Sequence, residues 1–88
     1  MITHTLKVEQ PYFQALVDGT KTFEVRRNDR GFQCGDTLRL IEWSAATDAR
    51  PAQCTGATET RTVSYVYSGD PRWPALMPGY VVLGLAAA

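Results

Sequence analysis

The sequence of 88 residues predicts a mainly β (α+β) fold, a small β-barrel of about five strands with one capping helix after the first strand. Five segments show the apolar–polar alternation, or the continuous apolar run, that is typical of strands. Only one segment has apolar residues at helical spacing, which disfavours a parallel sheet because such a sheet needs several crossover helices. A closed or nearly closed barrel would leave few exposed strand edges.

The first predicted strand covers residues 2–8, in which apolar residues alternate with threonine and lysine. The alternation places His4 on the apolar face of this strand. A lone histidine there is more often a hydrogen-bonded core residue than a ligand or a catalyst. His4 is still a secondary candidate for the functional site, because its strand would lie in the same small barrel as Glu24.

A helix is predicted next, from about residue 9 to residue 18. Pro11 suits the first helical position, where its missing N–H is not needed. Three residues form an apolar stripe at helical spacing, namely Phe13, Leu16 and Val17. Gly19 ends the helix, because glycine readily adopts the left-handed conformation after the last turn. A helix of about ten residues is unstable alone, so we expect it to dock on the sheet.

The second predicted strand follows this helix and carries several charges. Phe23 and Val25 alternate with polar residues, so we expect both to pack inward. This arrangement leaves Glu24 and Arg26 side by side on the other face. Lys21 stands where the chain leaves the turn, so its side chain is free to converge on the same spot. The three charged groups would then form a small polar pocket.

Two structural interpretations compete with a binding pocket at this strand. The charges could lie on an exposed strand, where lysine and glutamate discourage unwanted edge pairing. Alternatively, Glu24 and Arg26 form a structural ion pair, which at an exposed site contributes only about 0 to 1 kcal/mol.

The remaining strands are predicted over residues 37–43, 59–67 and 80–85. The last of these is a nearly continuous apolar run, as expected for a strand that is buried on both faces. The stretch 44–56 is small and polar and contains Pro51, which predicts a long mobile loop. A second loop, over residues 68–79, holds Trp73 between two prolines.

The balance of charge limits the possible partners. Nine basic residues match nine acidic ones, which argues against a long duplex DNA partner, because such binding is driven by phosphate neutralisation. The segment 21–30, which ends at Arg30, nevertheless holds four basic residues against two acidic ones. A short single strand of RNA, or one nucleotide in a pocket, therefore remains a compatible partner.

No metal or cofactor is expected. Cys34 and Cys54 are too far apart for a zinc knuckle, and a single histidine cannot complete a common structural site with them. Both thiols are expected to be free, and either buried or without a role. The sequence has neither a signal peptide nor an apolar run of about twenty residues. We therefore expect a cytoplasmic protein with no membrane partner and a single domain over residues 1–88.

Residues 19–26, which read GTKTFEVR, carry a resemblance to a known family. This run resembles the G-x-K-x-x-E-x-R signature of the ASCH domains, which belong to the PUA-like superfamily. Other segments, in the same order, resemble a group of small bacterial and phage ASCH-like proteins, so the likeness covers most of the chain apart from the two loops. These segments are residues 4–7, 12–13, 21–26, 28–30, 32–36 and 79–83.

The resemblance implies a PUA-like β-barrel with a polar cleft between barrel and helix, and a role in binding RNA or a nucleotide. By the motif, Lys21, Glu24 and Arg26 would line that cleft. The two cations would hold a phosphate or a base carbonyl, and Glu24 would accept from an exocyclic amine or orient Arg26. His4, Arg30 and Trp73 complete the set of candidate ligand-binding residues.

Modules that bind single-stranded RNA usually add aromatic platforms on which bases stack. The candidates here are Tyr12, Tyr65, Tyr67 and Trp73. An aromatic residue of a small β domain is more often in the core, so only Trp73 stands out, although it would equally pin its loop against the barrel.

Two other functions stay open. Some relatives with this fold are amidohydrolases acting on acetylated cytidine, and they use a lysine, a threonine three residues later and a distant glutamate. Lys21 matches the lysine, but Glu24 replaces the threonine, and only Glu59 offers a distant glutamate. A different hydrolysis of an acylated nucleoside would use Glu24 as general base and Lys21 to stabilise an oxyanion. The second alternative is a protein-interaction scaffold that uses its two loops.

Overall fold

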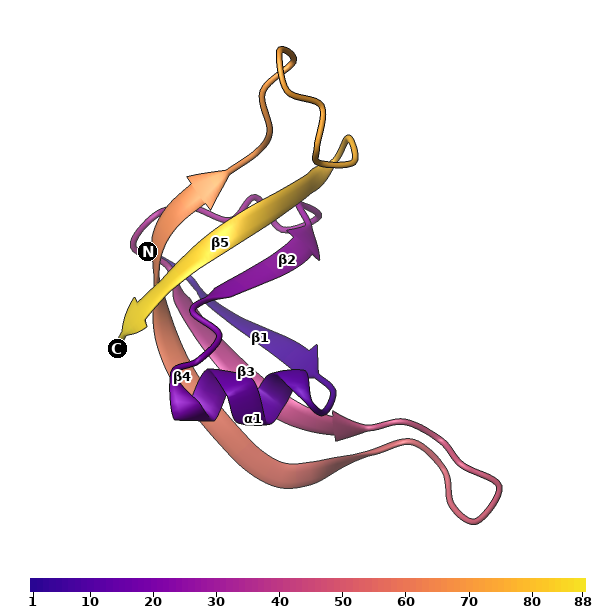
Figure 1. Ribbon diagram of the computed structural model, residues 1–88. Helices are drawn as coiled ribbons and strands as arrows, with labels where there is room; N and C mark the ends of the chain where they lie inside the picture. Colours follow the sequence, from indigo (N-terminus) through magenta and orange to yellow (C-terminus); the bar gives the residue numbers. More distant parts are fainter.

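Five strands and one short helix make up the molecule, and the computed structural model describes all 88 residues. In chain order the elements are β1 (Thr3–Val8), α1 (Tyr12–Asp18), β2 (Phe23–Arg27), β3 (Thr37–Ser44), β4 (Gln53–Tyr67) and β5 (Tyr80–Ala87) (Figure 1). The strands form one sheet in the order β1-β3-β4-β5-β2. The seven-residue α1 is the only helix, and it is neither long nor apolar enough to cross a membrane.

The sheet curls into a half-barrel. β1 pairs with β3 in parallel, and the other three pairs of strands are antiparallel. β1 and β2 are the two edges of the sheet and do not pair with each other. The prediction of a mainly β fold with one helix after the first strand is therefore confirmed. The sheet is not a closed barrel, because its edge strands β1 and β2 do not pair; side chains of both line the gap between them.

The hydrophobic core lies inside the curl of the sheet. Both buried residues of α1, Phe13 and Leu16, pack into it, which is how a helix too short to be stable alone is held in place. Every strand except β2 contributes buried apolar residues, and Phe32 adds one from the connection before β3. The ten core residues are Leu6, Val8, Phe13, Leu16, Phe32, Leu38, Leu40, Val63, Val81 and Leu83.

The inward-facing residues of β2 are the opposite of those predicted. Glu24 is buried with 6% exposure, whereas Phe23 and Val25 are 44% and 46% exposed. Alternation along a strand defines two faces, but it does not say which face points inward. Here the carboxylate of Glu24 can be buried because the ammonium of Lys21 pairs with it.

Two other element boundaries differ from the prediction. β4 already begins at Gln53, so the loop between β3 and β4 is shorter than the predicted stretch 44–56. The small, polar residues there lack a strand pattern of their own, and pairing of Gln53 with Ser44 and of Cys54 with Trp43 sets their conformation. The helix begins at Tyr12, because Pro11 precedes the first turn as its N-cap.

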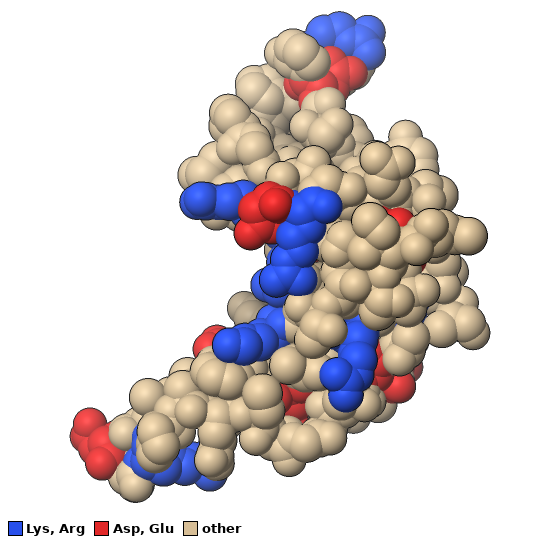
Figure 2. All heavy atoms as spheres, turned by 180° about the vertical axis from the view of Figure 1, so that it is seen from behind, with Lys and Arg blue, Asp and Glu red and all other residues tan.

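The two loops project from opposite ends of the half-barrel, so the molecule measures 46 × 28 × 24 Å (Figure 1). Between these ends one side of the molecule is hollowed. Figure 2 shows Lys and Arg side chains gathered around this hollow, with fewer Asp and Glu side chains beside them.

Candidate functional site

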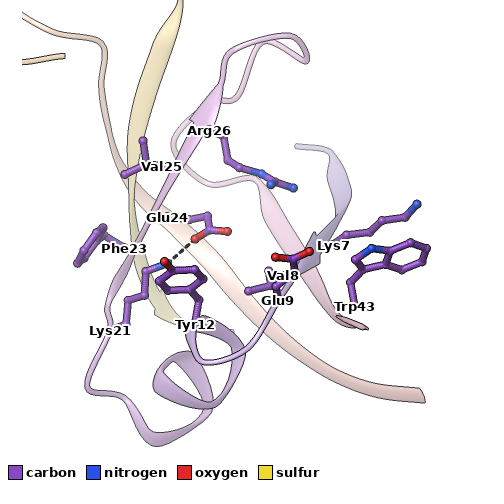
Figure 3. Close-up of a pocket in the computed structure, with 10 residues that line it drawn as sticks. All are labelled: Lys7, Val8, Glu9, Tyr12, Lys21, Phe23, Glu24, Val25, Arg26 and Trp43. Carbon is purple, nitrogen blue, oxygen red and sulfur yellow. Dashed lines mark hydrogen bonds and ion pairs between the residues drawn. The ribbon is translucent and has the colours of Figure 1, made fainter. Parts of the chain in front are cut away.

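A cleft of about 640 Å³ opens between the two edges of the sheet, next to the start of α1 (Figure 3). Three cations and two carboxylates line it, together with aromatic and aliphatic side chains. Its residues are Lys7, Val8, Glu9, Tyr12, Lys21, Phe23, Glu24, Val25, Arg26 and Trp43. The sequence prediction that Lys21, Glu24 and Arg26 converge on one spot agrees with this arrangement.

An ion pair between Lys21 and Glu24 forms one wall of the cleft. Lys21 Nζ lies 2.6 Å from Glu24 Oε1, and the side chains are 17% and 8% exposed. The ammonium also lies 5.3 Å from the ring centres of Tyr12 and Phe23. Lys21 thus lies against one carboxylate and two aromatic rings.

The turn after α1 fixes the position of Lys21. Gly19 has φ 79°, the left-handed conformation that ends a helix and that glycine adopts without strain. The backbone N–H of Lys21 and the hydroxyl of Thr20 both donate to the Ala15 carbonyl, at 3.0 and 3.2 Å. The turn is therefore bonded to the last turn of α1, and the lysine has little freedom to leave the cleft.

Arg26 lies two residues further along β2, on the same face as Glu24. Its guanidinium reaches from β2 toward β1, across the gap between the sheet edges (Figure 3). It makes no hydrogen bond or ion pair with the protein, in contrast to the Glu24–Arg26 pair considered from the sequence. Glu24 pairs with Lys21 instead, which leaves all the donors of Arg26 available to a ligand.

The opposite wall contains two residues that the sequence analysis did not select. Lys7 Nζ lies 4.1 Å from the ring centre of Trp43, a cation–π contact between β1 and β3. The parallel pairing of the two strands brings these residues together. No local pattern could reveal this contact, because the residues are far apart in the sequence. Tyr12, by contrast, was a candidate stacking residue and does line the cleft.

His4 does not line the cleft. It is buried, and its Nε2 lies 2.8 Å from Asp36 Oδ2, while its ring packs edge-on against Phe32. This is the hydrogen-bonded core position that the sequence analysis set against a ligand role. The sequence analysis missed Asp36, the buried carboxylate that holds His4 and also accepts from the backbone N–H groups of Ile2 and Gln33. These hydrogen bonds, chiefly that of His4, lower the pKa of Asp36 below its usual value.

Two other candidates lie outside the cleft. Arg30 Nη1 donates to the carbonyl of Thr5 at 2.7 Å, which links the segment after β2 to the edge strand β1. Trp73 is exposed in the loop between β4 and β5, where Arg72 stacks on it at 4.4 Å. The loop thus carries its own cation–π pair, and Trp73 contributes nothing to the cleft.

The structure brings no three metal-binding side chains together. No group of three or more His, Cys, Asp or Glu residues is placed to hold an ion. Cys34 and Cys54 are free and exposed. The chemistry that the cleft offers is therefore that of its cations, carboxylates and aromatic rings.

Comparisons with known proteins give a family and one phage relative. The model of a family described as "Domain of unknown function (DUF3850)" matches residues 3–85. A protein of Escherichia phage P2, described as "Uncharacterized 12.9 kDa protein in GpA 3'region", is 42% identical over 40 residues. That match covers 46% of this chain and 37% of the phage protein.

Proposed function

This chain belongs to the family described as Domain of unknown function (DUF3850), and because that description assigns no activity, we propose a function from its cleft. The cleft binds RNA or a nucleotide-sized ligand. The observation that carries this proposal is the unpartnered guanidinium of Arg26 beside the Lys21–Glu24 pair, with aromatic rings on both sides.

Each group has a role in holding such a ligand. Arg26 offers a planar set of donors to a phosphate or a base carbonyl, and Lys7 and Lys21 add positive charge. Glu24 uses Oε1 for Lys21, so its Oε2 can accept from an exocyclic amine. Tyr12 and Trp43 offer ring faces on which a base can stack.

We further propose that the family is related to the ASCH domains of the PUA-like superfamily. The G-x-K-x-x-E-x-R run begins at the C-cap of α1 and extends into β2, and its lysine, glutamate and arginine all line one cleft. A curled sheet with a helix after the first strand is compatible with the PUA-like β-barrel that this relationship implies.

The test is an NMR titration of the labelled protein with short RNA oligonucleotides and a panel of nucleosides. We expect shifts in the amides of residues 19–30, and Arg26→Gln should weaken binding about tenfold, as expected for one lost charge-assisted hydrogen bond. Arg39→Gln is the matched control, because Arg39 is exposed and does not line the cleft. The absence of shifts with every ligand would refute the proposal and direct attention to the two loops as a protein-interaction surface.

A hydrolase acting on an acylated nucleoside is the second candidate. The short contact between the buried Glu24 carboxylate and the Lys21 ammonium, at the wall of an open cleft, favours it. Glu24 would take a proton from the water that attacks the acyl carbonyl, and Lys21 would stabilise the oxyanion that forms there. Collapse of this intermediate would break the bond between the acyl carbon and the nucleoside, and Glu24 would return the proton to the departing nitrogen or oxygen. Chromatography of the titration samples decides between the candidates, since consumption of a nucleoside that Lys21→Ala abolishes would establish hydrolysis.

A further inference from the structure

Two smaller pockets share lining residues with the cleft. One of them, of about 210 Å³, shares Arg26 with the cleft and is lined by Leu6, Arg26, Arg27, Asp29, Arg30 and Phe32; we call it the arginine pocket. The other, of about 340 Å³, shares Glu9 and Trp43 with the cleft and also contains Glu42 and Arg50; we call it the glutamate pocket. Through these shared residues the three adjoin, and we call them together the groove; its two outer pockets carry different charges.

The arginine pocket suits a phosphate. It holds three arginines against one aspartate. Arg26 and Arg27 make no ion pair, and Arg30 uses Nη1 for the Thr5 carbonyl while its Nε is 4.0 Å from Asp29 Oδ1. Most guanidinium donors therefore point to no protein acceptor. Arginine is the side chain best suited to bind phosphate with two parallel hydrogen bonds.

The glutamate pocket has the opposite character. The Glu42 carboxylate accepts hydrogen bonds from Thr55 Oγ1, at 2.6 Å, and from the Gln10 amide. These bonds lower the pKa of Glu42, so it is ionised at neutral pH. Glu9 adds a second carboxylate, and the only cation there, Arg50, donates to the Ser44 hydroxyl. A phosphate at this end would face like charge.

From this asymmetry we infer that the groove binds a terminal nucleoside phosphate, either a free mononucleotide or the phosphorylated end of an RNA. The phosphate lies in the arginine pocket and the base lies in the cleft, against Tyr12 or Trp43. A strand that continued past Trp43 would bring its next phosphate to Glu9 and Glu42, so the rest of a bound RNA would have to leave the groove before the glutamate pocket. This inference rests on the proposed nucleotide-binding function and adds the ligand's end group and direction.

Calorimetric titration with nucleosides, their 5′- and 3′-monophosphates and inorganic phosphate tests the inference. We expect one of the monophosphates to bind at least about tenfold more tightly than its nucleoside, the gain of one charge-assisted contact. Arg27→Gln should remove this gain and leave nucleoside binding unchanged, because Arg27 lines the arginine pocket but not the cleft. Arg39→Gln should retain the gain. An HSQC spectrum of each variant verifies its fold.

Dinucleotides with and without a terminal phosphate extend the test to RNA. The dinucleotide with a terminal phosphate should bind more tightly than the one without it. Glu42→Gln should bind longer strands more tightly than the wild type does. The inference would be overturned if nucleosides and monophosphates bound equally tightly. It would also be overturned if inorganic phosphate bound but nucleotides bound no more tightly than nucleosides. In both cases the proposal that nucleosides bind in the cleft would stand. If no nucleoside, nucleotide or oligonucleotide binds, the proposed function itself fails and the inference fails with it.

Discussion

Asp36 gives the fold a predictable sensitivity to acid. The hydrogen bonds from His4, Ile2 and Gln33 favour its carboxylate, and its pKa is lowered from 3.8. A group whose pKa is lower in the folded state stabilises the fold above its unfolded pKa and loses this effect as the pH falls through the folded value. The free energy of unfolding of the wild type should therefore fall between pH 5 and about pH 2, and it should fall less in Asp36→Asn.

Urea unfolding across this pH range measures the effect. Asp48→Asn is a suitable control, because Asp48 is exposed and belongs to no ion pair. An Asp36→Asn variant with the same acid dependence as the wild type would mean that the hydrogen bonds to Asp36 do not control its titration.

The Lys21–Glu24 pair should be stabilising only as a pair. Lys21→Met leaves the carboxylate of Glu24 buried without its counter-ion, and we expect a loss of roughly 1–3 kcal/mol, the desolvation penalty of an unpaired buried group. The double variant with Glu24→Gln removes the unpaired charge and should recover most of this loss. A double-mutant cycle by thermal or chemical unfolding checks this, and additive losses would show that the two side chains are independent.

The sequence could predict the residues of the site that are neighbours in the chain, and it could not predict those that are distant. Lys21, Glu24 and Arg26 were found because one turn and one short strand hold them together. Lys7 and Trp43 come together through strand pairing, which no local pattern reveals. The His4–Asp36 bond likewise joins residues that the chain separates widely.

At the scale of one element, the helix α1 is held in part by a side chain of the strand β4. Arg61, in β4, donates from Nη2 to the carbonyl of Leu16 at 2.9 Å, which gives this acceptor of the last helical turn a second hydrogen bond beside that from the Gly19 N–H. We expect Arg61→Gln to destabilise the helix by about 1 kcal/mol, because a helix of seven residues has few internal hydrogen bonds to lose.

Hydrogen exchange of the α1 amides measures this effect. Exchange should become faster in Arg61→Gln, while the amides of the pair β4–β5 keep their protection. The control is Arg39→Gln, which removes an equal charge from an exposed position in β3. Unchanged exchange in α1 would show that packing of Phe13 and Leu16 alone holds the helix.

The type of each element was predictable, and its inner face and its limits were less so. Alternation identified β2 as a strand, but it did not show which of the two faces points inward. Glu24 lies inside because its carboxylate pairs with the ammonium of Lys21. The start of β4 was not predictable, because Gln53 and Cys54 adopt strand conformation through pairing with β3. Gly19 ended α1 as predicted, since its φ of 79° is set by local chemistry.

For the whole molecule, the neutral charge predicts a weak dependence of binding on salt. Positive charge is concentrated around one groove, and the terminal phosphate that we propose would engage only this part of the surface. The slope of log K against log salt is about −0.7 for each phosphate of a single strand, so we expect a slope no steeper than about −2 for a short RNA. Titration of one oligonucleotide at several salt concentrations measures it, and a much steeper slope would indicate a long polyanion track outside the groove.

The curl of the sheet could be predicted, and its final form could not. The five strands and one helix required a mainly β fold, and this is what the chain adopts. Whether the edges meet depends on the side chains between them. Here Glu24, Arg26 and Lys7 occupy the gap between β1 and β2, so the place where a barrel would close is the place where a ligand can enter.

The strand order also has a consequence for the time at which the site is assembled. β2 has a single partner, β5, and Glu24 pairs with Leu83 near the end of the chain. Contacts between residues far apart in the chain form only once the intervening chain exists, so β2, which carries Glu24 and Arg26, has no strand partner until the end of the chain has been made. A chain that lacks β5 would lose this partner together with the core residues Val81 and Leu83, so the cleft forms only with the complete sheet.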